Sequence, residues 1–335
     1  MHFFRKTNID FIGKRRLWYF VSTFVTVGGI IWALFRGVEF GIDFAGGTEV
    51  QLKFEKAVPI EQIRSALDEA GLRGAELKYY GTDESGVLIR VPVGASGKAI
   101  EGAKTTTAVT EAITKGVPGN KAQLMQEQHI GPKIGAELQQ KALLAVLFTC
   151  IAILIYLAFR FRFVYGVGAV IAIIHDVLVA FAFAVICNGI APWLNLEMNS
   201  TMLAAFLTIV GFSVNDTVII YDRIREDSKK YKGQDIYTIM NRAINETLPR
   251  TIITSGTVFL TLVVLFIWGG EVLRGFAFTM MVGVITGTYS SIFVASAISY
   301  DWMQREKKKS GMIPTSSVGS SRTEASKSKK VAATV

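Results

Sequence analysis

The sequence predicts a polytopic α-helical membrane protein with six transmembrane helices and an α+β exterior domain between helices 1 and 2. Two observations lead to this class. Half of the 335 residues are apolar, and apolar and charged residues fall into separate blocks along the chain, as in membrane proteins. In addition, one segment of about 100 residues between two apolar stretches shows the short periodic patterns of a compact domain.

Six apolar stretches are long enough to cross a bilayer, which takes ~20 residues in a helix. We expect these spans at 17–35, 142–159, 165–187, 200–221, 251–268 and 275–299. The first stretch is longer than the ~7 to 15 residues of a signal-peptide core, and no small-residue cleavage site follows it, so we expect it to be retained. The chain then divides into an N-terminal segment 1–16, helix 1 at 17–36, the exterior domain at 37–140, helices 2–6 at 141–300 with a cytoplasmic loop at 222–249, and a tail at 301–335.

Lys and Arg residues near the span ends predict the orientation. They are frequent in the N-terminal segment, in 222–249 and in the tail, whereas the loop 188–201 has none. Cytoplasmic loops carry the excess of such residues, so we expect both termini in the cytoplasm and the exterior domain in the periplasm of a bacterial inner membrane. The net charge of +9 then mainly reflects orientation. Because these cations flank spans, we expect membrane lipid and no nucleic acid as a partner.

The exterior domain is predicted to be ferredoxin-like. Its strands are expected at 48–54, 75–80, 87–93 and 122–130, and its helices at 59–70 and 98–114, from alternating and helical spacing of apolar residues. The order β-α-β-β-α-β is the split βαβ pattern. The domain has no nucleophile with a neighbouring base, so we expect a binding or mechanical module with no enzymatic activity.

No catalytic residue, metal site or cofactor is predicted elsewhere. The two cysteines, Cys150 and Cys187, fall in or at the end of spans and lack metal-binding spacing, so we expect inert packing. From about residue 310 the tail has almost no large apolar residues. Such a segment cannot offset its ordering entropy, and we expect it to be disordered.

Asp216 is the main candidate functional residue because it lies within the fourth span. A charged side chain there costs at least ~2.5 to 3.5 kcal/mol unless it is neutralised, paired or hydrated. Arg250 opens the fifth span and could lie at the same depth. Because an arginine favours the charged carboxylate and desolvation favours the neutral one, approach and withdrawal of the two side chains could load and release a proton. The alternative is a static pair that fixes helix register, or an Arg250 that only sets topology.

Further polar residues in the spans extend this candidate proton pathway. Ser213, Asn215 and Thr217 lie beside Asp216 in the sequence, and Thr254 lies one helical turn after Arg250. Arg250 and Thr254 begin a stripe that continues with Thr257 and Thr261, and we expect this stripe to face protein or water. The secondary candidates are His175, Asp176, Asp222 and Arg223.

Asp176 occupies a ridge of small residues in the third span, so we expect it to face the interior of the helix bundle, and two roles remain open: proton relay or helix contact. In the sixth span Gly283, Gly287 and Ser291 recur every four residues and are expected to form a helix-packing surface.

Asp43, Gly46 and Gly47 follow the first span in the signature Gly-Ile-Asp-Phe-Ala-Gly-Gly. We expect a structural role for them, as a hinge in which the two glycines supply unusual φ angles.

Four segments together resemble the SecF family of protein-export membrane subunits. They are 41–48 (GIDFAGGT), 130–138 (IGPKIGAEL), 211–226 (GFSVNDTVIIYDRIRE) and 247–255 (TLPRTIITS). The resemblance implies a member of the resistance-nodulation-division superfamily that pairs with SecD and assists the SecYEG translocon. It also implies use of the proton motive force to promote late translocation and release of preproteins, with Asp216 and Arg250 at the residues that the family ties to proton flow.

The residues leave alternatives open. A small-solute exporter half of the same superfamily, or a membrane scaffold without transport, would share the six-span plan. The coupling ion is expected to be H⁺, although an Asp with hydroxyl and amide neighbours could also serve Na⁺. A single six-span half has no second repeat to complete a pathway, so we expect a six-span partner.

Overall fold

The computed structural model describes residues 7–80, 84–92, 102–191, 194 and 196–309. Six helical stretches in these residues are long and apolar enough to cross a membrane, which confirms the predicted class. They are α1 (Arg15–Arg36), α5 (Pro132–Arg160), α6 (Phe163–Ile190), α7 (Ser200–Lys230), α8 (Ile236–Trp268) and α9 (Gly270–Ser290), which continues through the π-helical turn Ser291–Ala295 into α10 (Ser296–Lys309). The predicted disordered tail from about residue 310 lies outside the described residues.

The cytoplasmic loop predicted at 222–249 is mostly helical. Helix α7 runs on to Lys230 and α8 starts at Ile236, so only a short turn separates them. Helix α8 also includes Pro249, which precedes the predicted span 251–268. The extensions are stable because they are amphipathic and bury Ile224 and Ile244 against the bundle.

The exterior domain contains the predicted elements in the predicted order. A short helix α2 (Ile42–Ala45) leads into β1 (Gly47–Phe54), α3 (Ile60–Glu69), β2 (Glu76–Tyr80), β3 (Gly86–Pro92), α4 (Gly102–Gly116) and β4 (Ala122–Ile130). Residues 98–101 of the second predicted helix lie outside the described residues. The strand order is β2-β3-β1-β4, and all three pairs are antiparallel. Strand β3 therefore lies between β1 and β2, the two strands that α3 connects.

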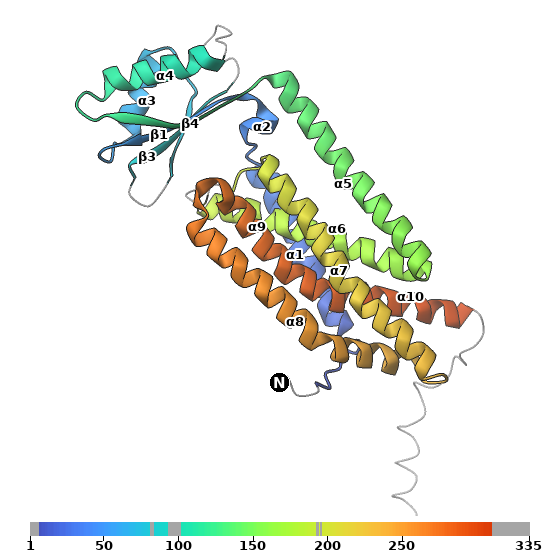
Figure 1. The fold of residues 1–335 in the computed structure, drawn as a ribbon. Helices are drawn as coiled ribbons and strands as arrows, with labels where there is room; N and C mark the ends of the chain where they lie inside the picture. The colour runs from blue at the N-terminus through green and yellow to red at the C-terminus, as the bar shows by residue number, and fades with distance from the viewer. Residues whose placement is uncertain (1–6, 81–83, 93–101, 192–193, 195, 310–335) are drawn as a thin grey trace, which may run out of the picture.

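The sheet has one apolar and one polar face because residue types alternate along its strands. Helices α3 and α4 cover the apolar face, with Val50, Leu52, Ile89 and Ile113 in the core between them. These helices lie on the side away from the transmembrane helices (Figure 1). The polar face is therefore the one that meets the bundle.

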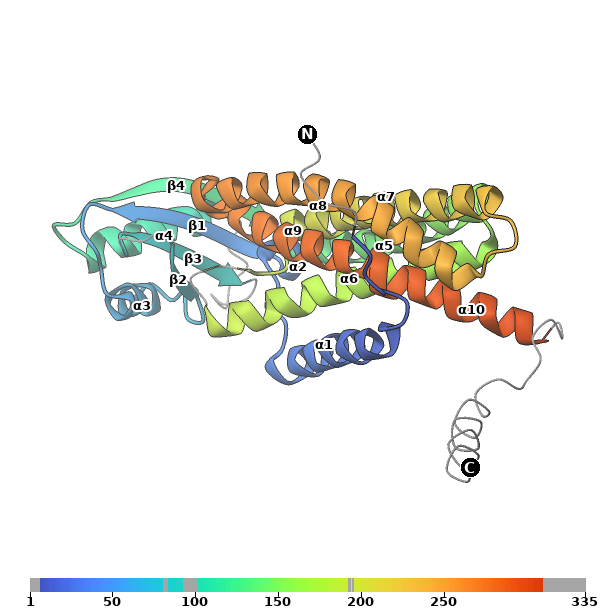
Figure 2. The same cartoon turned by 90° about the horizontal axis from the view of Figure 1, so that it is seen from below.

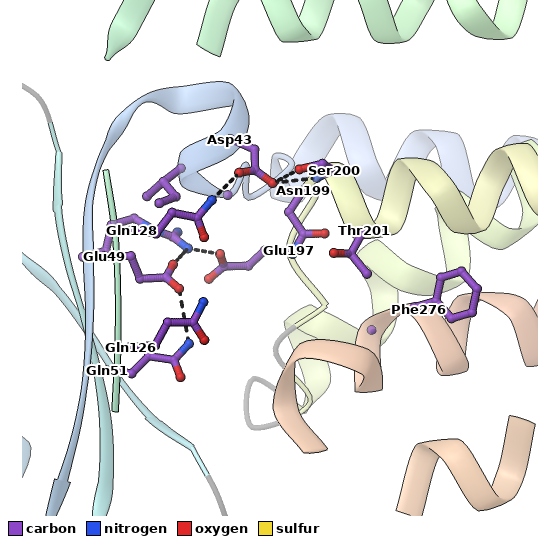
Figure 3. A pocket seen from close by; sticks show the side chains of 14 residues that line it. Asp43, Glu49, Gln51, Gln126, Gln128, Glu197, Asn199, Ser200, Thr201 and Phe276 are labelled. Atoms are coloured by element: carbon purple, nitrogen blue, oxygen red, sulfur yellow. Dashed lines mark hydrogen bonds and ion pairs between the residues drawn. The ribbon is translucent and has the colours of Figure 1, made fainter. Parts of the chain in front are cut away.

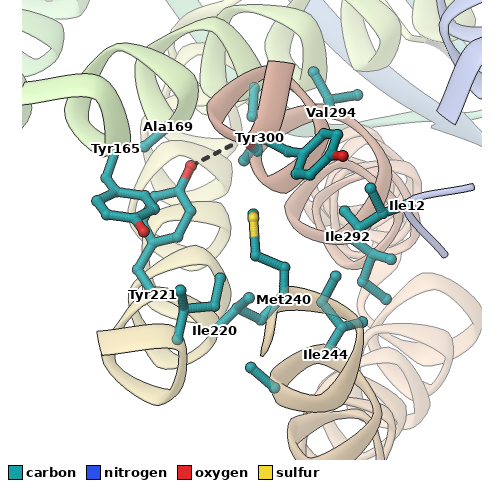
Figure 4. Packing of buried hydrophobic residues seen from close by; sticks show 14 of the residues in the cluster. Ile12, Tyr165, Ala169, Ile220, Tyr221, Met240, Ile244, Ile292, Val294 and Tyr300 are labelled. Atoms are coloured by element: carbon teal, nitrogen blue, oxygen red, sulfur yellow. Dashed lines mark hydrogen bonds between the residues drawn. The ribbon is translucent and has the colours of Figure 1, made fainter. Parts of the chain in front are cut away.

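Helices α6, α7, α8 and α9 pack together, and α1 lies along α6 (Figure 2). Helix α5 stands apart from the bundle over most of its length (Figure 1). The described parts of both chain ends lie on the side opposite the exterior domain (Figure 1). At that end a large apolar cluster includes Tyr165, Tyr221, Met240 and Ile292, drawn from four different helices (Figure 4). The half of the bundle away from the exterior domain therefore has a packed apolar core.

The glycine ridge of α9 lies against α7. A Cβ added to Gly283 would lie 2.2 Å from Cγ1 of Ile209, and one added to Gly287 would lie 3.4 Å from Cβ of Ser213. Ser291, one turn further along, is fully buried. Small residues here allow the close approach of α9 to α7, which brings the polar side chains of the two helices together.

Candidate functional site

Asp216 lies inside the bundle on the inward face of α7. Its side chain is 0% exposed. The hydroxyl of Ser255 on α8 donates to Oδ2 of Asp216 at 3.3 Å, and Oγ1 of Thr288 on α9 lies 2.7 Å from Oγ of Ser255. Oδ1 of Asp216 has no hydrogen-bond partner among the described residues. The carboxyl group thus sits in a protein-lined position with a single weak hydrogen bond, which is a poor environment for a permanent charge.

Asp176 on α6 forms a second buried cluster. Its Oδ2 accepts hydrogen bonds from the hydroxyls of Ser213 on α7 and Ser290 on α9, each at 2.6 Å. Its Oδ1 lies 3.0 Å from Nδ1 of His175. This carboxyl group therefore joins α6, α7 and α9. Asp176 lies in the interior of the bundle, as predicted. Among the described residues, no hydrogen bond connects this cluster with Asp216.

Arg250 does not form an ion pair with Asp216 in the described part of the chain. It is exposed and lines an open cavity of about 1000 Å³ between α7 and α8. The same cavity is lined by Asp222, Arg223 and Thr247. The structure therefore has the pair apart: Arg250 lines an open cavity, whereas Asp216 is buried and does not line it.

The other predicted pathway residues do not gather around Asp216. Ser213 bonds to Asp176 instead, Asn215 is exposed, and Oγ1 of the buried Thr217 has no partner among the described residues. The hydroxyl of Thr254 donates to its own helix at the carbonyl of Arg250.

The remaining candidates form ion pairs at the surface of the protein. Asp222 pairs with Arg160 at 3.0 Å, and Nε of Arg223 pairs with Glu246 at 2.6 Å. Thr257 and Thr261, which continue the predicted stripe, are exposed on α8.

The sequence patterns did not single out Ser255, Thr288 and Ser290. Ser255 donates to Asp216, Ser290 donates to Asp176, and Thr288 donates to Ser255. Ser255 follows Thr254 directly, and successive residues of an α-helix point about 100° apart. The sequence favoured the longer stripe through Thr254, but the inward face of α8 is the one with Thr251 and Ser255. The usable signal was this second i, i+4 pair of hydroxyl residues.

A second polar region joins the exterior domain to the bundle, and we call it the exterior junction. It consists of Glu39, Asp43, Lys78, Arg90, Gln128, Glu197 and Ser200. Figure 3 shows Asp43, Gln128, Glu197 and Ser200 converging between the polar face of the sheet and the end of α7. A cavity of about 170 Å³ adjoins them.

Asp43 connects three parts of this junction. Its Oδ2 accepts hydrogen bonds from the backbone N–H of Ser200, at 2.8 Å, and from the Ser200 hydroxyl, while its Oδ1 accepts one from Nε2 of Gln128 at 2.9 Å. The glycines expected to form a hinge follow directly: Gly46 has φ 74° and Gly47 has φ 143°. Both values lie in the region that glycine adopts most easily.

Ion pairs complete the junction. Glu197, 3% exposed, pairs with Arg90 on β3 and with Lys78 on β2 at 2.6 Å, and Lys78 also pairs with Glu39 at 2.6 Å. Burial alone would lower the pKa of Lys78, but the two carboxylates outweigh it and raise this pKa. Burial alone would raise the pKa of Glu39, but the hydrogen bond and charge of Lys78 hold it below its usual value.

Comparisons with known proteins agree with this architecture. Residues 109–305 match the family model "Protein export membrane protein SecD/SecF, C-terminal", and residues 31–58 match the "SecD/SecF GG Motif". The chain is 39% identical over 296 residues to the protein translocase subunit SecF of Calditerrivibrio nitroreducens, covering 88% of this chain and 94% of that protein. It is 40% identical to the corresponding subunit of Magnetococcus marinus over 88% of this chain and 92% of that protein.

A solved structure is also similar. The crystal structure of SecDF, a translocon-associated membrane protein from Thermus thermophilus, superposes with a TM-score of 0.76 at 33% identity and covers 89% of this chain. This chain spans 39% of that SecDF chain. The six spans, the exterior sheet and the buried carboxyl groups define a membrane protein of the SecD/SecF type. With near full-length matches to SecF subunits, the chain belongs to the SecF family.

Proposed function

We propose that the protein acts in Sec-dependent protein export, paired with a SecD-like subunit, and uses proton movement through Asp216 to promote late translocation and release of polypeptides by the SecYEG channel. The observation that carries this proposal is the environment of Asp216. A fully buried carboxyl group has one hydroxyl partner at 3.3 Å and one oxygen without a partner among the described residues, and the candidate cation, Arg250, lines a separate open cavity. A static ion pair would instead be in direct contact.

Proton energetics are sufficient for such a role. One charge crossing a potential of 100 mV releases ~2.3 kcal/mol. That is enough to change a two-state equilibrium of the bundle about fiftyfold. Protonation of Asp216 removes a desolvated charge, and the return of the Arg250 guanidinium toward the carboxylate favours release of the proton. Neither step needs a metal, a cofactor or enzymatic chemistry, and we propose that the protein has none of these.

An exposed polar face within the spans supports a partner of the same kind. Gly211 on α7 and Gly256 on α8 have no atom within 4 Å of an added Cβ, and Asn215, Thr257 and Thr261 on the same two helices are exposed. Small and polar residues are found where transmembrane helices pack, because lipid cannot satisfy them. A six-span SecD-like partner would cover this face and complete a pathway between two repeats. We place this pair in the bacterial inner membrane with both termini in the cytoplasm.

The test is reconstitution of the full chain with its SecD-like partner and SecYEG in vesicles that carry a proton gradient. Asp216→Asn should abolish the gradient-dependent part of export and the associated proton uptake. Glu306→Gln is the control: it removes an exposed carboxylate on α10 that does not line the cavity of Arg250, and it should keep both activities. Export that is gradient-dependent in Asp216→Asn would refute the proton role. Replacing external Na⁺ by K⁺ should leave activity unchanged if the ion is H⁺.

A further inference from the structure

The exterior junction contacts the N-terminal end of α7, the helix that carries Asp216. Ser200, whose N–H and hydroxyl both donate to Asp43, is the first residue of α7. Asp216 lies 16 residues further along, which corresponds to about 24 Å at ~1.5 Å per residue. Helix α7 is continuous over this distance, whereas α8 contains Pro249. A displacement of α7 at Asp216 therefore reaches Ser200 without an intervening break.

On its other side, the exterior junction contacts the sheet of the exterior domain. Gln128 of β4 donates to Asp43, and Arg90 of β3 and Lys78 of β2 pair with Glu197. Side chains from β2 and β3 thus meet the segment that leads into α7, and one from β4 meets Asp43, which accepts hydrogen bonds from the first residue of α7. Backbone hydrogen bonds reinforce the contact, from Gly41 N to Met198 O at 2.8 Å and from Met198 N to Glu39 O at 2.9 Å.

The covalent link alone would not fix the angle of the domain. Gly46 and Gly47, between α2 and β1, have positive φ angles and no side chains that could hold the angle by packing. The polar contacts supply the constraint instead. Arg90 and Glu197 are nearly fully buried, and separating a desolvated pair leaves two uncompensated charges, so the contact resists opening.

We propose that Asp43 and Glu197 are positioning residues that couple α7 to the exterior domain, so that movement of α7 on protonation of Asp216 is passed to the polypeptide-facing side. This inference rests on the proposed function of Asp216. It adds that the exterior domain moves together with α7 as one body, and does not swing freely about the two glycines.

The test uses the full chain with its SecD-like partner, after replacement of Cys150 and Cys187. Spin labels at Glu69 on α3 and at Trp268 at the exterior end of α8 report the domain position by pulsed electron paramagnetic resonance. Both positions are exposed. In the parent chain, Asp216→Asn should shift the label-to-label distance. In the Asp43→Asn/Glu197→Gln background the distribution should broaden and this shift should disappear.

Export is measured in the same variants. Loss of hydrogen bonds and ion pairs to charged groups should reduce the docked population, and with it gradient-driven export, about tenfold or more. The matched control is Glu76→Gln, which removes another partner of Arg90 that lies within the exterior domain and is 59% exposed; its export should stay within about twofold of the parent. The infrared carboxyl band of Asp216 should be unchanged in Asp43→Asn/Glu197→Gln and in Glu76→Gln, which a general collapse of the bundle would not allow.

The outcomes separate the two proposals. Loss of export in Asp216→Asn, combined with full export and an unchanged distance shift in Asp43→Asn/Glu197→Gln, would overturn the coupling and leave the proton role intact. Full gradient-dependent export in Asp216→Asn would overturn the proton role and the coupling that rests on it. If the double variant misfolds, the single variants Asp43→Asn and Glu197→Gln decide by the same two readouts.

Discussion

Replacing Ser213 or Ser290 with alanine should measurably destabilise the helix bundle. Each hydroxyl donates to Oδ2 of Asp176 at 2.6 Å and joins α6 to a different helix. A hydrogen bond to a charged group contributes about 1.5 to 3 kcal/mol, whereas interhelical hydrogen bonds in membranes average ~0.6 and reach ~1.7 kcal/mol. We therefore expect each substitution to lower the free energy of unfolding by ~1 to 2 kcal/mol.

The two effects should not be additive, because both hydroxyls serve the same oxygen. Either serine can still stabilise Oδ2 after the other is removed, but the double variant leaves this buried oxygen without either donor. The double variant should therefore cost ~0.5 kcal/mol or more beyond the sum of the single ones. Asp176→Ala, which also leaves both hydroxyls without their acceptor and opens a cavity, should cost about 3 to 5 kcal/mol.

The assay is reversible unfolding in mixed detergent micelles, followed by circular dichroism. Ser296→Ala is the matched control, because this buried hydroxyl donates to the backbone of its own helical stretch at Ser291 and joins no second helix. It should cost less than ~0.5 kcal/mol. If Ser213→Ala and Ser290→Ala cost no more than Ser296→Ala, the view that Asp176 ties three helices together is refuted.

Two further predictions concern packing and pH. Gly283→Leu should lower the free energy of unfolding by about 1 to 3 kcal/mol, because its Cβ would lie 2.2 Å from Ile209. Gly256→Leu, with open space around it, should leave the stability of the isolated chain unchanged but weaken co-purification with a SecD-like partner. Equal stability of the two variants would contradict the packing argument. The exterior junction should be insensitive to pH near neutrality. The lowered pKa of Glu39 gives a contribution that is present above its ordinary value of 4.5 and is lost as the pH falls below it, whereas the raised pKa of Lys78 gives one that is present below 10.5 and is lost as the pH rises above it. Protease resistance of the exterior domain should therefore stay constant between these limits, and a step near pH 7 would contradict the assignment.

The sequence predicted the elements well because their signals are local. Apolar stretches longer than a bilayer is thick, the Lys and Arg asymmetry, and the alternation in 48–54 depend only on neighbouring residues. The same is true of the glycine ridge of α9, whose four-residue spacing lies on one helix face. The main miss in the fold, the helical character of much of 222–249, arose because charged residues there mask a buried face that only packing reveals.

By itself, the sequence determined six membrane helices, the exterior domain and the presence of buried carboxyl groups at Asp176 and Asp216, because hydrophobicity and period are properties of the chain. The tertiary structure alone decided which hydroxyl meets which carboxyl group. Ser213 lies three residues from Asp216, yet it bonds to Asp176, since the rotation of α7 against α6 and α9 sets its direction. Asp43 likewise reaches Ser200 across 157 positions. Such contacts depend on angles between helices and on long loop closures, and short-range patterns carry no information about either.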